Sequence, residues 1–584
     1  MRYLNTPGPL LIMVLLVLFA ACRNDSMLNE SSCSRTGNEV IIRQRAEPDF
    51  INPMLTSSGY ADQINQLIFL PLQTIHPTTL EMTPVLVKER PEITPTDEGG
   101  MRYTFDILEE AVWDDGSPVT ALDYLFTVKA ALHPGINDTR FGPYLRILDS
   151  VEIDPDNPKH FSVTTKQQDQ LGEEIVSNTV YIMPAYHYDP EGILAKIPQQ
   201  AFFTEGQLDK YKEELERFAQ QFSEPQYSRE PAGITGCGAY RMDNWITGQM
   251  ITLSKKENWW GDDLADDYPM LGAYPDKIIF QPIAEAATAI SMIQGEDIDL
   301  VPELSPDAYI QISEDSLVKQ CYNLESFPQL VRSLLSLNTH SPKLSSKNVR
   351  RALALSMDAE QIIQTIYNGF GDRLFGPVPP SIAFVNKELQ PLPYDTEQAK
   401  SLLKEAGWED TNQDGTVDKM INGIQVEMVL NFDVPVESQT GQQVALLIKE
   451  QMKPSGIGIN IKPGEWNEIQ RRFHVGDFEI VPVGRTFPSP TIWNPRQNYH
   501  SQGQNYTGFG NAETDALIDR ILTTFDEEER FKLYRELQAI IYDEQPEIYI
   551  FTPRARIAIH NRFETPLTPI SPGFVSSLIR LKQQ

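Results

Sequence analysis

The chain has 584 residues, and its 81 acidic side chains exceed its 49 lysines and arginines, so the formal net charge at pH 7 is −32. Nucleic-acid binding depends on clustered cations that replace the counterions of the phosphates, and the sequence has no run rich in lysine or arginine. The composition therefore argues against a nucleic-acid partner. Hydrophobic residues make up 41% of the chain and charged residues 22%, which predicts a folded protein with a large core.

The first 21 residues have the pattern of a secretory signal. The single charge of Arg2 precedes an uninterrupted apolar run, 10–21, which is too short to cross a hydrocarbon layer of ~30 Å as a helix. Two alanines stand directly before Cys22, in a pattern that resembles the lipobox of bacterial lipoproteins, with Phe19 where an aliphatic residue is usual. That resemblance implies cleavage before Cys22 and its lipidation. The alternative is an ordinary signal peptide that happens to end before a cysteine.

The residues after Cys22 predict a tether between a lipid anchor and a folded body. Residues 23–38 are rich in serine and asparagine and have no apolar period. More than one acyl chain on the cysteine would hold the protein stably at a bilayer. Cys33 lies in this tether, where a free thiol is one option, and the sequence leaves open whether Cys237 and Cys321 pair.

Beyond the tether the chain alternates strand-like and helix-like segments, as α/β proteins do. The helix signals are specific in places: Thr120 is an N-cap, Gly407 is a stop and Pro546 ends another helical pattern. The segment around 205–224 is polar and charged and is expected to be a helical surface insertion. Strands are expected at 40–43 and 103–108, and helices at 122–132, 396–406 and 531–541.

A series of motifs follows one another along this body. They are Asn52-Pro53 with 55–72, the aromatic and Asp-Gly segment 103–123, the glycine turn 236–241, the acidic turn 295–299, the helices 348–358 and 394–407, and the segment 505–511. In this order they resemble family 5 of the extracellular solute-binding proteins, which are the oligopeptide, dipeptide and nickel binding components of ABC importers. The resemblance covers nearly the whole chain after the tether.

The resemblance implies an α/β, two-lobed fold of the periplasmic-binding-protein-like class II type, with an extra subdomain in the N-terminal lobe. A ligand would bind in the cleft between the lobes and stabilise their closure. The chain is expected to cross between the lobes near 302–324 and near 529–551. The implied segments are a signal peptide at 1–21, a lipid-anchored tether at 22–38, lobe I at 39–315 with an inserted subdomain at about 71–225, lobe II at 316–535, and a return to lobe I at 536–584.

One motif bears on the choice of ligand. In peptide-binding members of the family, an acidic residue in an Asp-aromatic-x-x-Pro stretch pairs with the free amine of the peptide. Alignment of the matching stretch, 483–490, on Pro490 places Thr486 at the acidic position. Arg485 would instead favour an anionic group, because its guanidinium offers a planar fork to a carboxylate or phosphate; alternatively it faces solvent or pairs with an acid. The hypothesis is that this protein does not select a free N-terminal amine.

Four further residues are ligand-binding candidates. Tyr60, Phe487 and Trp493 are candidates for an aromatic wall, because ring faces accept varied side chains. The alternative for each ring is a place in a hydrophobic core. Cys237 occupies a turn that lines the cleft in relatives, where a small residue is usual, and it needs no special role there.

Metal and catalytic motifs are incomplete. Residues 410–418 match the first part of a calcium loop, but Ile421 replaces the bidentate glutamate at the twelfth position, so a simple loop is the alternative. The eight histidines lack metal-ligand spacing, and there is no nucleophile elbow, phosphate-binding loop or dinucleotide fingerprint. No metal and no cofactor is therefore predicted, and the weak calcium candidates are Asp410, Asn412, Asp414 and Asp418.

These patterns predict a non-catalytic, monomeric lipoprotein outside the cytoplasmic membrane, in the periplasm or at the cell surface. It would capture a peptide or similar solute and deliver it to the transmembrane subunits of an ABC permease. Two alternatives remain: an extracytoplasmic α/β hydrolase, which would need a titratable pair with perturbed pKa values in the cleft, and a sensory solute-binding module. The identity of the ligand is left open.

Overall fold

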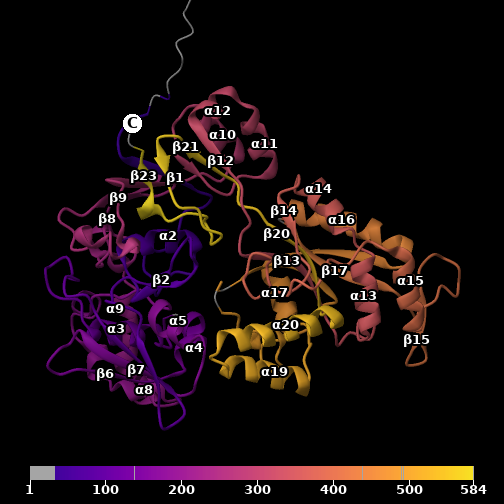
Figure 1. Cartoon of the computed structure of the whole chain (residues 1–584), viewed down its shortest axis with the longest axis horizontal. Helices are drawn as coiled ribbons and strands as arrows, with labels where there is room; N and C mark the ends of the chain where they lie inside the picture. The colour runs from indigo at the N-terminus through magenta and orange to yellow at the C-terminus, as the bar shows by residue number, and fades with distance from the viewer. Residues whose placement is uncertain are drawn as a thin grey trace, which may run out of the picture.

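The computed structural model describes residues 33, 35–136, 138–436, 438–487, 489–490 and 492–582. The expected signal peptide, the lipidation candidate Cys22 and most of the tether lie outside the described residues. Two bodies stand side by side, each with its own large β-sheet and surrounding helices (Figure 1). The expected two-lobed α/β fold is thus confirmed. In the part of the chain that the structure describes, no helix combines the length and apolarity needed to cross a membrane.

Lobe I is built on a seven-stranded sheet with the order β12-β21-β11-β1-β10-β9-β8. Both ends of the chain contribute, because β1 pairs in parallel with β10 and β11, while β21 from near the C-terminus pairs with β11 and β12. Its strands are β1 (Glu39–Gln44), β8 (Tyr240–Ile246), β9 (Met250–Lys255), β10 (Lys277–Pro282), β11 (Leu300–Val301), β12 (Tyr322–Glu325) and β21 (Ile557–His560), and its helices are α2 (Gly59–Ile68), α10 (Ala286–Gln294), α11 (Pro306–Glu314) and α12 (Ser316–Cys321).

A second, four-stranded antiparallel sheet with the order β4-β5-β7-β6 lies within the same lobe. Its hydrophobic core is continuous with that of the large sheet, since Phe105 and Phe161 belong to the same cluster as Val40. Thr120 and Asp123 form a capping box at the start of α3, as the N-cap signal predicts. The elements are β2 (Gln73–Ile75), β3 (Met82–Pro84), β4 (Glu92–Pro95), β5 (Met101–Asp106), β6 (Leu148–Ile153), β7 (His160–Thr165), α3 (Ala121–Ala131), α4 (Asp138–Leu145), α5 (Gly172–Asn178), α6 (Ala185–Tyr188), α7 (Ile193–Lys196), α8 (Gln199–Phe203) and α9 (Lys212–Phe222).

Lobe II is built on a six-stranded sheet with the order β14-β20-β13-β19-β17-β18. Neighbouring residues of one strand enter different cores, with Leu335 on one face and Leu334 on the other, as the two-residue period of a buried strand requires. Its elements are β13 (Val331–Leu337), β14 (Gly371–Arg373), β17 (Val429–Pro435), β18 (Gly458–Gly464), β19 (Ile480–Thr486), β20 (Glu547–Pro553), the hairpin of β15 (Asp418–Ile421) and β16 (Ile424–Glu427), and the helices α13 (Lys347–Leu355), α14 (Ala359–Ile366), α15 (Thr396–Glu405), α16 (Gln439–Met452), α17 (Trp466–His474), α18 (Arg496–Tyr499), α19 (Ala512–Thr523) and α20 (Glu527–Glu544).

The chain crosses between the two large sheets later than the sequence predicts. The first crossing joins β12 to β13 through residues 326–330, and the second joins β20 to β21 through residues 554–556. The expected lobe boundaries at 315/316 and 535/536 therefore lie before the crossings that the strand pairing defines. The reason is that β20 is an inner strand of the lobe II sheet, paired with β13 and β14, and that α20 packs into the lobe II core through Tyr534 and Leu537.

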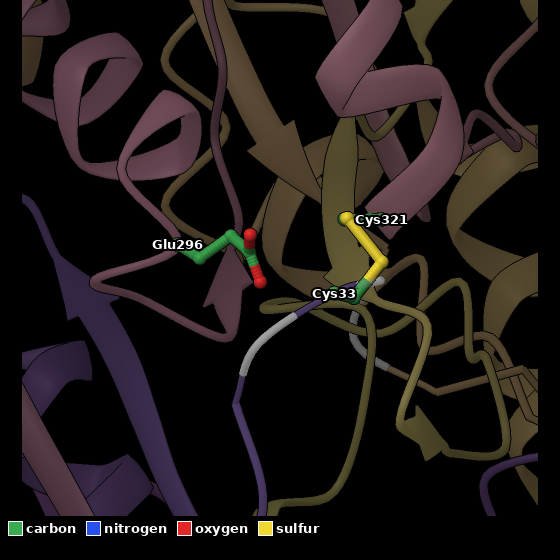
Figure 2. Close-up of side chains that lie close together, drawn as sticks. All are labelled: Cys33, Glu296 and Cys321. Carbon is green, nitrogen blue, oxygen red and sulfur yellow. A yellow bond between two sulfur atoms is a disulfide. The ribbon is translucent and has the colours of Figure 1, made fainter. Parts of the chain in front are cut away.

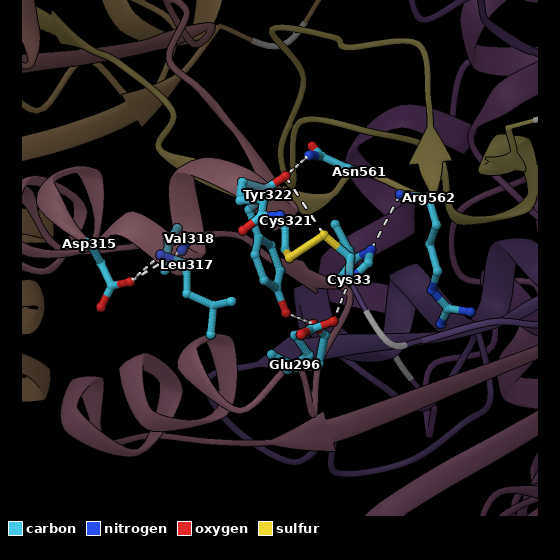
Figure 3. The surroundings of a disulfide bond; sticks show 12 residues. Cys33, Glu296, Asp315, Leu317, Val318, Cys321, Tyr322, Asn561 and Arg562 are labelled. Atoms are coloured by element: carbon cyan, nitrogen blue, oxygen red, sulfur yellow. Dashed lines mark hydrogen bonds and ion pairs between the residues drawn. A yellow bond between two sulfur atoms is a disulfide. The ribbon is translucent and has the colours of Figure 1, made fainter. Parts of the chain in front are cut away.

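The N-terminal segment is fastened to lobe I from Cys33 onward. Cys33 forms a disulfide with Cys321 at the end of α12, beside Glu296 (Figure 2). The surroundings in Figure 3 include Arg562, whose guanidinium donates hydrogen bonds to the carbonyls of Thr36 and Gly37. The tether expected to run to Asn38 is thus held to the body over its last residues. The pairing of Cys237 with Cys321 is excluded, and Cys237 is a free, buried thiol.

Candidate ligand-binding cleft

A cavity of about 800 Å³ lies between the two lobes and is lined from both. Its lobe I wall comes from α2, α4 and α5, and its lobe II wall comes from β13, β19 and the segment that follows β19. The lining residues are Asp62, Arg140, Phe141, Tyr144, Leu171, Glu174, Ile175, Asn178 and Thr179 of lobe I, and Arg332, Arg485, Thr486, Ser489, Ile492, Asn494, Gln497 and Asn498 of lobe II.

The lobe I wall contains one ion pair and one buried acid. Arg140 donates hydrogen bonds to the two carboxylate oxygens of Asp62, at 3.3 and 3.0 Å, so these two charges compensate each other. Burial raises the pKa of the Glu174 carboxyl to about 7, and a hydrogen bond with Ser489 of lobe II lowers it only in part. The Oε2 atom of Glu174 is buried without a hydrogen-bond partner among the described residues. Near neutral pH this wall therefore holds a carboxyl close to its titration point.

The lobe II wall contains two arginines that lie directly opposite each other on antiparallel strands. Arg332 of β13 pairs in register with Arg485 of β19. The Arg485 guanidinium donates a hydrogen bond to Glu547 of β20, and Tyr499 and Tyr549 donate their hydroxyl protons to the same carboxylate, at 2.7 and 3.1 Å. The residues of this arginine–carboxylate cluster thus come from three neighbouring strands and from α18.

The charges in the cluster keep Glu547 ionised although it is buried. Burial alone would raise the pKa of its carboxyl, but the charges of Arg485 and Arg332 and the hydrogen bonds from the two tyrosines hold it below its ordinary value. Burial alone would likewise lower the pKa of Arg485, and the Glu547 carboxylate raises it above its usual range. The Arg485–Glu547 pair is therefore a true ion pair in the floor of the cleft.

Two of the sequence candidates line the cavity. Thr486 does so without an acidic neighbour, since the described lobe II residues of the lining include no Asp or Glu. Arg485 also lines it, but it is paired with Glu547, which is the alternative that the sequence leaves open. Arg485 by itself is therefore not an uncompensated charge offered to a ligand.

The aromatic wall expected from the sequence is not found at those positions. Phe487 and Trp493 are each 1% exposed and belong to the lobe II core, and Cys237 is equally buried in the lobe I core. The Tyr60 hydroxyl donates a hydrogen bond of 3.0 Å to Glu303, and its ring is not part of the cavity lining. Bulky rings fill cores as well as they line clefts, and only the packing distinguishes the two uses.

The aromatic lining is supplied by Phe141 and Tyr144, three residues apart on α4. The sequence analysis missed both, together with Arg332 and Glu174. The i, i+3 spacing of the rings next to Arg140 is a local signal for one helix face. That signal does not say which face of the helix meets the other lobe.

The side chains of the calcium-loop candidates form hydrogen bonds within the loop and the hairpin that follows it. Asp410 accepts hydrogen bonds from the backbone amides of Asp414 and Gly415, at 3.2 and 3.0 Å, and Asp414 accepts one from Thr416. Asn412 donates to Asp414, while Asp418 is occupied by the side chains of Thr411 and Gln425. The segment is therefore a turn that satisfies its own carboxylates before the hairpin of β15 and β16.

One other cluster has metal-like spacing. Cys33, Glu296 and Cys321 bring their sulfur and carboxylate atoms within 4.8 Å of one another (Figure 2). The two sulfurs are joined in the disulfide, and only a thiolate is a ligand for a metal ion. The cluster is thus a crosslink with a neighbouring acid.

Two α/β lobes, two crossings and a cavity lined from both sides define a two-lobed binding protein that can close on a ligand by a hinge motion. The pattern of the bacterial extracellular solute-binding proteins, family 5, matches residues 81–507. The chain belongs to this family, as the order of its motifs predicts.

Individual relatives are similar over most of the chain. The oligopeptide-binding protein AppA of Bacillus subtilis is 23% identical over 566 residues, which cover 95% of this chain and 94% of AppA. The solved structure of that protein with a nonapeptide has a TM-score of 0.69 at 21% identity, with 94% of this chain and 100% of that chain covered. NikA from Brucella suis with Fe(III)-EDTA has a TM-score of 0.72 at 17% identity, with 93% and 100% covered. These structures share the fold.

Proposed function

We propose that this protein is the substrate-binding lipoprotein of an ABC importer and captures an oligopeptide or a related solute between its lobes. The observation that carries the proposal is the cavity of about 800 Å³ with both lobes in its lining. A ligand that contacts both walls binds the closed arrangement more tightly than the open one, and closure is what a permease would recognise. The family and the name of the oligopeptide-binding relative support a peptide as the solute.

The protein is proposed to act as a monomer outside the cytoplasmic membrane, held by acyl chains on Cys22. Several chains give stable attachment because each buried CH₂ contributes about 0.8 kcal/mol. Intact mass measurement of the full chain expressed in a bacterial host tests this part. The expected mass is that of residues 22–584 plus acyl groups, and replacement of Cys22 by Ser should leave an unacylated protein. An unacylated protein with Cys22 in place would overturn the anchor.

Native mass spectrometry of the protein purified without refolding tests the capture of peptides. The expected result is a set of masses above that of the protein, which on denaturation release peptides of several residues. The control is the same protein after unfolding, dialysis and refolding, which should bind an added peptide library again. Release of a single non-peptide solute, or failure to take up any peptide after refolding, would contradict the peptide class.

A further inference from the structure

The lobe II wall of the cleft carries more positive charge than its carboxylate compensates. Arg332 and Arg485 are two guanidinium groups, and Glu547 is the one acid in their cluster. Both oxygens of Glu547 already accept hydrogen bonds, Oε1 from Arg485 and Oε2 from the hydroxyls of Tyr499 and Tyr549. The cluster as a whole therefore has a net charge of about +1, which resides on Arg332.

The hydrogen-bond donors of Arg332 are incompletely used. Its side chain is almost fully buried, with the residue 2% exposed, and it still contributes to the lining of the cavity. One terminal nitrogen donates to the carbonyl of Pro377 at 2.7 Å, while Nε has no partner among the described residues. A buried guanidinium with an unfilled donor is costly unless an acceptor is supplied. Nε itself is buried from solvent, so a ligand in the cavity would meet the part of the Arg332 side chain that lines the cavity.

The position of Arg332 is held from two sides, which pre-organises it for a ligand. The bond to Pro377 fixes the end of the side chain, and the guanidinium lies 5.3 Å from the centre of the Phe487 ring. Arg485 is compensated by Glu547, and the remaining described lobe II lining residues with polar side chains are neutral. An anion at this wall would therefore meet a fixed cation, and the described lobe II lining residues include no acid that would repel it.

We infer that Arg332 is the residue that selects a carboxylate-bearing solute, by binding an anionic group of the ligand on the lobe II side of the cleft. This inference rests on the proposed capture of peptides and deepens it. It assigns to Arg332 the role that the sequence suggests for Arg485, because Arg485 is paired with Glu547. The carboxylate of the solute is either a peptide C-terminus or an acidic side chain, since both present the same planar pair of oxygens.

Three synthetic pentapeptide libraries distinguish these sources in the full-length protein. The first has free C-termini and no Asp or Glu, the second is the same library with C-terminal amides, and the third has C-terminal amides and one Asp. Binding is measured by calorimetry on refolded protein. We expect the amide library without Asp to bind at least tenfold more weakly than at least one of the other two libraries, because it lacks any carboxylate. Preference for the first identifies the C-terminus, and preference for the third identifies a side chain.

The variant Arg332→Gln should abolish the preference, and Arg332→Lys should keep part of it because lysine retains the charge but not the fork. Arg241→Gln, at an exposed position of β8 that is not part of the cavity lining, is the matched control and should bind as the unchanged protein does. Melting curves show whether each variant is folded. If Arg332→Gln does not fold, the comparison of the three libraries on the unchanged protein still tests whether a carboxylate is selected.

Equal binding of all three libraries overturns the inference while peptide capture stands. Binding of none overturns peptide capture itself, and the inference with it.

Discussion

At the scale of single residues, the cleft depends on how buried charges are compensated. Glu547 is 0% exposed and accepts hydrogen bonds from one arginine and two tyrosines. A buried charge in such a network contributes to stability chiefly because its removal leaves the partners unpaired. Glu547 is accordingly the residue of the cleft at which a small chemical change should have the largest effect on folding.

Replacement of Glu547 by Gln should lower the free energy of unfolding by about 3–5 kcal/mol, because two guanidinium groups would remain beside a neutral amide. Urea unfolding followed by circular dichroism measures the loss. Glu427→Gln on the exposed strand β16 is the matched control, for which a change below about 0.5 kcal/mol is expected. Equal, small losses in both variants would contradict the ion-pair description of the cluster.

Glu174 provides a prediction of pH dependence. Its folded pKa of about 7 lies above the ordinary value of 4.5, so between these values the native protein binds more protons than the unfolded chain. Stability contributed by this group therefore falls as the pH rises from about 4.5 to about 7 and then stays constant. Glu174→Gln removes this contribution. The difference in unfolding free energy, variant minus unchanged protein, should rise from pH 5 to pH 8 in urea titrations, and a flat or falling difference would contradict it.

At the scale of elements, the sequence predicts local structure well. The strand at 40–43, the helix after Thr120 and the helix that Gly407 ends are all present, because apolar spacing, caps and stops act within a few residues. The expected return to lobe I at residue 536 divides α20 and places β20 in lobe I, whereas β20 pairs with β13 and β14 in the lobe II sheet. Their patterns specify a helix and a buried strand, but not the sheet that receives the strand.

The disulfide at the end of α12 should fasten the N-terminal segment to lobe I. Loss of the bond in Cys33→Ser leaves this segment held only by the contacts of Arg35 with Asp299 and Glu296 and by the bonds of Arg562 to Thr36 and Gly37. Because these contacts are partly exposed, trypsin should cleave after Arg35 faster than in the unchanged protein. A loss of about 2–4 kcal/mol in unfolding free energy is expected as well.

Cys237→Ala is the control for this experiment, since Cys237 is a free thiol in the lobe I core and has no link to the N-terminal segment. Cleavage after Arg35 should stay slow in this variant even if its stability changes. Equal cleavage rates for Cys33→Ser and the unchanged protein would show that the hydrogen bonds alone fasten the segment.

At the scale of the whole molecule, two of the contacts between the lobes differ in how far they lie from the crossings. Gln170, just before α5, donates hydrogen bonds to the carbonyls of Ile521 and Thr524 in lobe II, where α5 faces α19 and α20 (Figure 1). Near the crossings, Asn368 donates to Asp307 at 2.7 Å. When the lobes rotate about a hinge, two groups far from the hinge move apart by a large distance and their contact breaks. Two groups near the hinge change their separation little.

Replacement of Gln170 by Ala should therefore shift the ligand-free protein towards an open arrangement, and Asn368→Ala, the matched control, should not. Small-angle X-ray scattering measures the radius of gyration of each variant with and without a saturating peptide library. A larger radius for Gln170→Ala without ligand, and equal radii with ligand, is the expected result, because a ligand that contacts both walls restores closure. An unchanged ligand-free radius would contradict the role of this contact.

The sequence by itself determined the family, the order of the local elements and the absence of an acid at Thr486, since these follow from residue identity and short-range spacing. The tertiary structure alone decided that Cys33 pairs with Cys321, 288 residues away, and that Phe487 and Trp493 belong to a core. It also decided that Arg485 is paired with Glu547, which leaves the charge of Arg332 for a ligand. The physical reason is that hydrogen bonds within a helix or turn are local, whereas the compensation of a buried charge depends on which distant strands the sheet places side by side.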